Sequence, residues 1–320
     1  MNGTHDRTGD AVIKTDRPRE QPLVSVIVPL LNAAETVGAQ LAALADQDYS
    51  GRYEVLVADN GSTDGSQDEV TRYVSRFCSL TVLDASQRCG VSHARNVGLE
   101  HCRGNVVLTC DADDIVSGHW ITAMVEALAE YDIVGGAYDQ AELNSPQVVA
   151  WHAGMPKVGL PIPFGVAPVI LGANFGGWAS AIRNLEGWND RYVGGGEDLE
   201  FSWKAQEAGY RLGFAADAVV HYRHRQSLRD LAKKSYRNGL MVPQLMAEFR
   251  HSTLGRPRFN RGRRRVAAGL IKNIPAAFVS SRHRGLWVKT FATSAGVLVG
   301  SLRRRLRHES SRRIGGSRSR

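Results

Sequence analysis

Three carboxylates crowd together where a short apolar run ends. Val106–Leu108 are residues typical of a buried strand, and Asp111, Asp113 and Asp114 follow within four positions. Like charges this close repel and raise one another's pKa unless a positive charge lies among them. A divalent cation held by hard oxygen ligands meets this need, and open α/β sheets place ligands at the carboxyl ends of their strands. The spacing therefore predicts a metal site, although a solvated loop that caps the next helix explains the same residues.

Two further acidic positions could do chemistry. Asp59 ends another predicted strand beside Asn60 and Gly61, where a carboxylate can accept hydrogen bonds from a ribose or a base N–H. An Asx-turn explains that segment equally well. Glu197 and Asp198 follow three glycines, a run that suits a mobile loop close to a substrate. The residues alone also fit a helix with an acidic first turn, which the helix dipole favours.

The elements that must position these residues alternate along the chain. Apolar β-branched runs at 23–32, 53–59, 80–86, 106–110 and 132–138 predict strands, and helical spacing at 34–47, 67–77, 90–102 and 120–131 predicts helices between them. This order predicts an α/β fold, a mostly parallel sheet with helices on both faces. Neither the glycine-rich dinucleotide fingerprint nor the phosphate-binding G-x-x-x-x-G-K-[ST] loop is present.

The composition is that of a globular protein. The chain has 320 residues, 43% hydrophobic and 22% charged, and its four cysteines show no metal-binding spacing, so they are interpreted as reduced thiols of a cytoplasmic protein. Residues 1–21 are polar and predict a disordered segment rather than a signal peptide or an anchor. The uncharged run 158–182 is long enough to span a membrane, but its prolines and glycines predict buried loop and strand.

The net charge of +8 is distributed unevenly. Residues 1–220 contain 15 Lys and Arg against 29 Asp and Glu, a net −14, whereas residues 221–320 contain 25 against 3, a net +22. We expect a catalytic domain at 22–226, a basic helical extension at 227–302 that begins with a Ser cap, and a disordered basic tail at 303–320.

The basic extension has three interpretations. Trp287, Phe291, Ala295, Leu298 and Leu302 fall on one helical face beside arginines, as in helices that lie on anionic membrane surfaces. A helical subdomain that covers the catalytic domain, with solvated arginines, explains them nearly as well. Binding of nucleic acid has the charge in its favour, but the region has no recognisable fold motif or aromatic platform, which argues against it.

Five segments, in this order, resemble the family 2 glycosyltransferases, an inverting family with the GT-A fold. They are SVIVPLLNAAETV, VLVADNGSTDGS, GVSHARNVGLEHCRGNVVLTCDADD, GGWASAIRNLEGWNDRYVGGGEDLEFSWKAQEAGYRL and AVVHYRHRQSL, and together they cover roughly residues 23–228. The resemblance implies an enzyme that moves a sugar from a nucleotide-sugar donor to a hydroxyl of a glycan, lipid-linked or small-molecule acceptor. It also implies a Mg²⁺ or Mn²⁺ cofactor.

The resemblance assigns the donor site. Asp113 matches the direct metal ligand, and Asp111 matches the carboxylate directed at both ribose and metal. Asp114 is then expected to cap the following helix. The positions that match nucleotide-sugar contacts are Pro29, Asn32, Asp59, Arg95 and Asp111. The family pattern also places a late histidine near the metal or diphosphate, matched by His221, with His224 as the competing position.

The resemblance also assigns the acceptor side. Inverting transfer is a single displacement, so one base must deprotonate the acceptor hydroxyl. That role falls to Asp198, with Glu197 as its neighbour. Trp178 and Trp188 could stack on sugars, although isolated tryptophans more often pack in a core or loop.

Two other functions fit parts of the sequence. A sugar-phosphate nucleotidyltransferase shares this kind of sheet but usually carries a G-x-G-x-R loop after its first strand, which VPLLNAAET does not provide. A non-catalytic binding module remains a second alternative, and such a relative would more naturally have lost Asp113 or Asp198.

Overall fold

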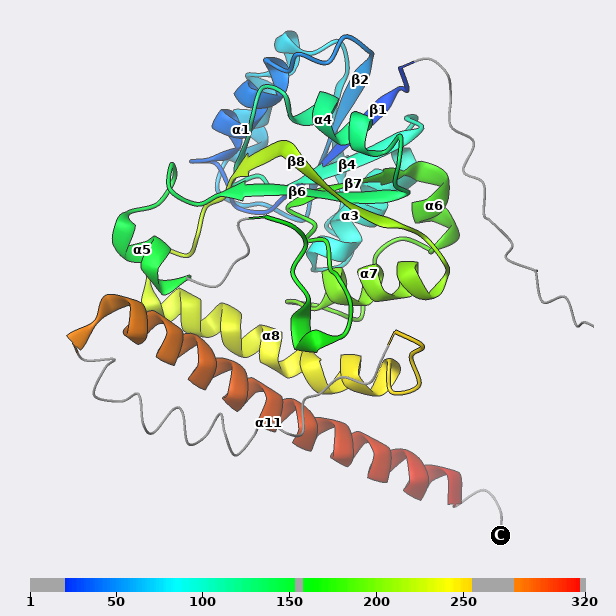
Figure 1. Ribbon diagram of the computed structural model, residues 1–320, viewed down its shortest axis with the longest axis vertical. Coiled ribbons are helices and arrows are strands. Elements are labelled where there is room, and N and C mark those ends of the chain that lie inside the picture. Colours follow the sequence, from blue (N-terminus) through cyan, green and yellow to red (C-terminus); the bar gives the residue numbers. More distant parts are fainter. Residues whose placement is uncertain (1–20, 153–157, 255–278, 317–320) are drawn as a thin grey trace, which may run out of the picture.

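A single mixed sheet forms the centre of the molecule. The computed structural model describes residues 21–152, 158–254 and 279–316, with the backbone alone for 307–316. Within these residues eight strands pair in the order β3-β2-β1-β4-β7-β6-β8-β5 (Figure 1). The predicted disordered segment 1–21 lies outside the described residues except for Gln21.

The first half of the sheet is parallel, as predicted. Its strands are β1 (Val24–Leu30), β2 (Tyr53–Asp59), β3 (Leu80–Asp84) and β4 (Val106–Cys110), and β1 pairs with both β2 and β4. The connecting helices are α1 (Val37–Ala45), α2 (Ser66–Thr71), a 3-10 turn η1 (Val74–Arg76) and α3 (Val91–His101). Because parallel strands end at one edge, the tips of β2 and β4 lie on the same side of the sheet.

The second half of the sheet is mixed rather than parallel. Its strands are β5 (Ile115–Val116), β6 (Ile133–Asp139), β7 (Asn174–Trp178) and β8 (Leu212–His221). Strand β7 runs antiparallel to both β4 and β6, β8 is parallel to β6, and β5 is antiparallel to β8. Cys110 at the end of β4 pairs with Asn174 at the start of β7, so the segment before β7 reaches the acidic tip of β4.

Helices of the second half complete the catalytic body. They are α4 (Trp120–Ala127), α5 (Pro146–Trp151), a 3-10 turn η2 (Pro163–Gly165), α6 (Ala179–Asn184) and α7 (Glu197–Glu207). The uncharged run 158–182 forms loop, η2, β7 and the start of α6, in agreement with the prediction of buried loop and strand. In the described ranges we find no helix with the length and hydrophobicity needed to cross a bilayer.

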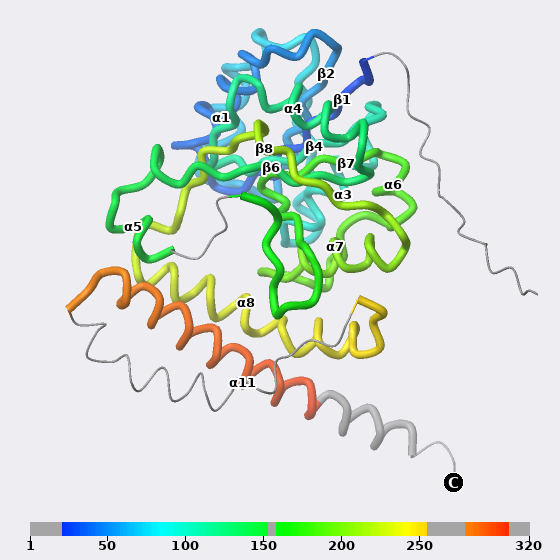
Figure 2. The backbone as a smooth tube through the Cα atoms, viewed as in Figure 1, coloured from blue at the N-terminus to red at the C-terminus, as the bar shows by residue number. Residues whose placement is uncertain are grey.

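Two long helices pack together outside the sheet. Helix α8 (Leu228–Glu248) begins at the predicted cap, where the Ser227 hydroxyl accepts from the Asp230 N–H at 3.1 Å. Helix α11 (Ser281–Gly316) lies alongside it (Figures 1 and 2). The predicted linker after α8 lies mostly outside the described residues. Helix α11 continues past 303, where the disordered tail was predicted to begin, as far as Gly316, and arginine and leucine in this segment favour a helix.

Candidate active site

The acidic tip of β4 is a compact group of carboxylates. Oxygen atoms of Asp111, Asp113 and Asp114 all lie within 4.8 Å of one another. Burial raises the pKa of the Asp113 carboxyl, and Asp111 raises it further. Burial and mutual repulsion thus disfavour the charged carboxylates. Three hard oxygen donors at this separation fit a divalent cation such as Mg²⁺ or Mn²⁺, whose charge would offset both effects.

Arg95 links this acidic tip to a second carboxylate. Its guanidinium comes from α3, is 2% exposed, and lies 3.5 Å from Asp111 Oδ1 and 3.2 Å from Asp198 Oδ1. A Cβ atom at Gly172 would come within 2.3 Å of the Arg95 Cζ, so a larger residue there would displace this guanidinium. Arg95 is therefore not a solvated helix arginine but the centre of a buried charge network.

The proposed base lies on the first turn of α7. Gly194, Gly195 and Gly196 all have positive φ, and Gly196 leads directly into the helix at Glu197. The Gly172 N–H donates to the Asp198 carboxylate. Burial raises the pKa of Asp198, while Arg95 opposes that rise. Burial and the Asp198 charge raise the pKa of Glu197 to about 7. The acidic first turn predicted from sequence is present, but both carboxylates are turned into the site.

Asp114 does not cap the next helix, so that expectation is wrong. Helix α4 begins only at Trp120, after the short strand β5. The Asp114 side chain is 1% exposed and its Oδ1 accepts from the Arg223 N–H at 2.7 Å. Its Oδ2 has no hydrogen-bond partner within the described chain, and burial together with Asp111 and Asp113 raises its pKa to about 9. Asp114 thus anchors the segment after β8 to the acidic tip.

Basic side chains that sequence reasoning missed face the acidic group. Arg225 Nη1 lies 3.6 Å from Asp113 Oδ2, and Arg223 Nε donates to the Asp113 carbonyl at 2.9 Å. Lys234 of α8 donates to the Tyr222 hydroxyl at 3.1 Å and stabilises the charged forms of Asp113 and Asp198. The sequence signal for these arginines was their position in the segment AVVHYRHR, close to His221.

The two candidate histidines have other contacts in the structure. His221 Nδ1 lies 3.0 Å from Asp139 Oδ2 and 2.9 Å from Glu142 Oε2 rather than beside Asp111 or Asp113. His224 is 4% exposed, its Nε2 donates to Gln140 Oε1 at 2.9 Å, and its ring stacks on His152 at 3.8 Å. These contacts give His224 a structural role and leave His221 in a separate acidic group.

The loops after β1 and β2 form the other end of the site. Asp59 is 3% exposed, and its carboxylate accepts from the Ser62 N–H at 3.0 Å and from the Gln67 amide. Asn32 adopts φ 50° and its Oδ1 accepts from the Thr63 N–H at 2.9 Å. Pro29 pairs with Ala58 in the sheet, one position before the pair of Leu30 and Asp59. The Asx-type turn is therefore present. The three predicted donor-site residues lie at the end of β1, in the loop after it and at the end of β2.

The two tryptophans considered as sugar platforms belong to the core. Trp178 is 6% exposed and donates to the Leu128 carbonyl at 3.3 Å. Trp188 is 2% exposed and stacks on Phe201 at a centroid distance of 5.4 Å. Neither ring presents a face to solvent on which a sugar could stack.

Comparison with known families decides the assignment. The model of glycosyl transferase family 2 matches residues 25–184, half of the chain, and the model of glycosyl transferase family group 2 matches residues 106–304. The chain belongs to glycosyl transferase family 2. The protein is therefore a glycosyltransferase that takes a sugar from a nucleotide-sugar donor. This assignment excludes the sugar-phosphate nucleotidyltransferase.

Curated relatives of this glycosyltransferase are distant. It is 28% identical over 221 residues to the glycosyltransferase AglE of Haloferax volcanii, which covers 68% of this chain and 72% of AglE. It is 26% identical over 260 residues to the pre-mycofactocin glycosyltransferase of Mycobacterium tuberculosis, covering 73% of this chain but only half of that protein.

A solved structure confirms the GT-A fold predicted for the glycosyltransferase. The mannosyltransferase PcManGT from Pyrobaculum calidifontis, in complex with GDP-Man and Mn²⁺, matches with a TM-score of 0.65 at 22% identity. The match covers 88% of each chain. At this identity the likeness concerns the fold alone.

Proposed function

We propose that this glycosyltransferase catalyses metal-dependent, inverting transfer to a hydroxyl of a glycan, lipid-linked or small-molecule acceptor. The observation that carries the proposal is the bridge that Arg95 makes between Asp111 and Asp198. The Arg95 guanidinium thus lies between Asp111, which would bind the metal, and Asp198, which would act as the base. The donor and acceptor functions, which arise from distant parts of the sequence, thus share one site.

The donor side uses the acidic tip and the loops beyond it. Asp111 and Asp113 would hold Mg²⁺ or Mn²⁺, which when bound supplies positive charge to the donor diphosphate and the leaving group. Asp59 would accept a hydrogen bond from the nucleobase, with Pro29 and Asn32 lining the same pocket. His221 was the third ligand expected from the sequence. In the structure it groups with Asp139 and Glu142 and not with the three aspartates, so its role as a ligand stays a prediction.

The acceptor side uses the first turn of α7. Asp198 would take the proton of the acceptor hydroxyl as its oxygen forms the new bond to the anomeric carbon. The bond from that carbon to the diphosphate breaks, and the nucleoside diphosphate leaves with the bonding electrons. The raised pKa of Asp198 makes it a stronger base than an exposed aspartate, and Arg95 orients it. Glu197 would contact the acceptor beside it.

The location we propose is the inner face of the plasma membrane, with the protein bound peripherally. Helix α11 exposes Phe291, Leu298 and Leu302, at 53%, 50% and 51%. Arg303, Arg304 and Arg305 follow in the same helix and are exposed. An amphipathic helix of this kind is suited to an anionic lipid surface, where a lipid-linked acceptor would be found.

Donor binding tests the proposal. We expect nucleotide sugars from a panel to raise the melting temperature of the wild-type protein only when Mn²⁺ or Mg²⁺ is present. Asp113→Asn should abolish this shift without unfolding the protein, because one of the two metal-binding carboxylates is lost. Asp68→Asn, which changes an exposed carboxylate on α2, serves as the matched control. Unchanged Mn²⁺-dependent binding by Asp113→Asn would refute the metal site.

A further inference from the structure

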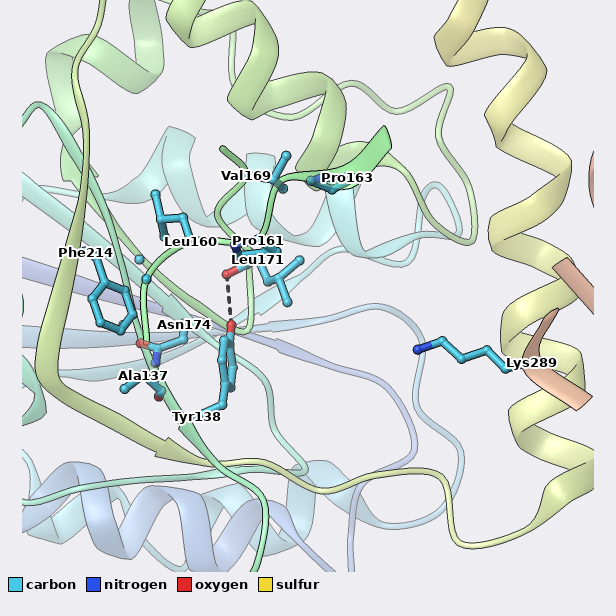
Figure 3. A pocket seen from close by; sticks show the side chains of 13 residues that line it. Ala137, Tyr138, Leu160, Pro161, Pro163, Val169, Leu171, Asn174, Phe214 and Lys289 are labelled. Carbon is cyan, nitrogen blue, oxygen red and sulfur yellow. Dashed lines mark hydrogen bonds between the residues drawn. The ribbon is translucent and has the colours of Figure 1, made fainter. Parts of the chain in front are cut away.

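A cavity lies beside the proposed acceptor side of the active site. It has a volume of about 190 Å³ and is lined mainly by apolar groups from β6, β8 and the segment 159–171 (Figure 3). Side chains of Leu160, Pro161, Val169, Leu171 and Phe214 form much of its wall. Such a lining favours a hydrocarbon-like portion of a ligand over a free sugar, which would lose hydrogen bonds to water.

One cation faces this apolar cavity. Lys289 lines the cavity and extends from α11 towards the side where Tyr138 lies (Figure 3). Among the described residues Lys289 makes no hydrogen bond and no ion pair, and it experiences the positive charge of Lys234 on α8. Partial burial and the Lys234 charge lower the pKa of Lys289, because loss of water and a nearby like charge both disfavour its charged form. An anion bound here would favour the charged form of Lys289.

The cavity adjoins the reacting groups through two consecutive residues. The Leu171 carbonyl, in the cavity wall, accepts from the Tyr138 hydroxyl at 3.4 Å. The next residue, Gly172, donates its N–H to Asp198. A molecule held in the cavity would therefore lie against the segment that positions the proposed base, on the acceptor side.

We propose that this cavity binds an amphiphilic acceptor that carries a phosphate group, with its apolar portion against Leu160 and Leu171 and its phosphate at Lys289. The assignment as acceptor rests on the proposed function; the binding of an amphiphilic phosphate does not. Both halves of the ligand are required by the site, because an apolar wall without a cation would accept neutral lipids and a cation without the wall would accept free phosphate.

Titration calorimetry with three probes tests this site in the metal-free full-length protein. The probes are decyl phosphate, decyl glucoside with the same chain but no charge, and inorganic phosphate. The two decyl probes are kept below their critical micelle concentrations. We expect decyl phosphate to bind at least about tenfold more tightly than either of the others, the scale of one charge-assisted contact. Equal affinity for decyl phosphate and decyl glucoside would overturn the role of Lys289.

Two variants locate the binding. Lys289→Gln should weaken decyl phosphate about tenfold, to the level of the neutral probe, and Leu160→Asp should weaken all chain-bearing probes. Lys233→Gln, which removes an exposed lysine of α8 paired with Asp230 at 3.3 Å, is the control and should change nothing. Wild-type affinity in Lys289→Gln, or full displacement of decyl phosphate by GDP or UDP with Mn²⁺, would overturn the proposal.

The outcome separates this site from the donor site. The donor site is tested by nucleotide-sugar binding to Asp113→Asn in the presence of Mn²⁺, an experiment that uses no decyl phosphate. If donor binding behaves as proposed while decyl phosphate fails to bind selectively, the cavity assignment alone is wrong. If decyl phosphate binds as expected but no nucleotide sugar binds with metal, the proposed reaction is wrong and the cavity stands.

Discussion

At the scale of residues, the site depends on balancing buried charge. Arg95 contacts carboxylates that are 16 and 103 positions away in the chain, and its own side chain is almost closed to water. Removing one partner of a buried charge group leaves the others uncompensated, which is costly. We therefore expect conservative variants at these positions to be more informative than alanine.

Asp198→Asn is expected to separate binding from chemistry. The amide keeps the size of the side chain and can still accept from Arg95, but it cannot take a proton. Turnover should fall by about 10²-fold or more, while Mn²⁺-dependent donor binding is retained. Steady-state kinetics and donor titration on the same preparations check this, with Glu207→Gln on the exposed end of α7 as control. Near-native turnover in Asp198→Asn would move the base elsewhere.

The stacked histidines make stability depend on pH. Burial lowers the pKa of His152 to about 4 and that of His224 to about 3, below the usual value near 6.5. The unfolded chain therefore binds protons at a higher pH than the folded one, so this contribution is present above about pH 6.5 and is lost as the pH falls towards 4.

His224→Gln tests this linkage. We expect its unfolding free energy, measured by urea denaturation between pH 7 and pH 5, to fall less steeply than that of the wild type, because one group no longer gains a proton on unfolding. His283→Gln, on the exposed part of α11, should keep the wild-type slope. Parallel slopes for His224→Gln and wild type would contradict the assignment.

At the scale of elements, glycines bring α8 and α11 into backbone contact. A Cβ at Gly239 would lie 2.3 Å from the Thr293 carbonyl oxygen, and one at Gly296 would lie 2.2 Å from the Tyr236 carbonyl oxygen. A Cβ at Gly300 would lie 2.5 Å from the Leu240 carbonyl oxygen. Because backbone atoms cannot rotate away, only glycine permits this separation. The close packing fixes the face of α11 that carries Lys289 towards the catalytic body.

Gly296→Leu should force the helix pair apart. Overpacking a close contact costs about 1–3 kcal/mol, and here the obstruction is backbone, so we expect the upper end and a melting temperature lower by about 5 °C or more. Calorimetry and limited proteolysis within α11 measure the effect. Thr290→Leu, on an exposed part of α11, is the matched control. A stable Gly296→Leu with unchanged proteolysis would mean that the helices do not pack through this glycine.

At the scale of the whole molecule, charge and apolar exposure coincide on the C-terminal helix. Residues 221–320 carry the net positive charge, and the catalytic body carries the negative charge. Helix α11 packs on α8 through its glycines and exposes Phe291, Leu298 and Leu302. This orientation would place the active site close to any surface that α11 binds.

Vesicle binding tests that orientation. We expect co-sedimentation with anionic liposomes, weakened by salt, and none with neutral liposomes. The reason is that attraction between the arginines and anionic lipids must bring the helix to the surface before its apolar side chains can insert. Phe291→Ser combined with Leu298→Ser should reduce binding. Val82→Ser, which changes an exposed residue on β3, should not. Equal binding to neutral vesicles, or a preference for duplex DNA, would contradict the membrane assignment.

Local patterns in the sequence were enough to predict most of the elements. The strand and helix order from β1 to β6 apart from the short strand β5, the cap at Ser227 and the helix that carries Glu197 and Asp198 follow from periodicity and from turn residues, which act over a few positions. The GT-A fold was predicted from five segments in family order, and the comparisons confirm it. The mixed second half of the sheet was missed, because strand direction depends on long-range pairing.

By itself, then, the sequence determined where carboxylates stand at the ends of strands and helices, since hydrophobic periodicity and turn chemistry are local. Only the tertiary structure decided their partners. It placed Arg95 between Asp111 and Asp198. It also brought Asp114 into contact with the segment after β8, and His221 into contact with Asp139 and Glu142. These contacts follow from β7 running antiparallel to β4 and from the pairing of β8, which bring together residues separated by up to about a hundred positions. No short pattern encodes such pairing, because its free energy comes from the packed sheet as a whole.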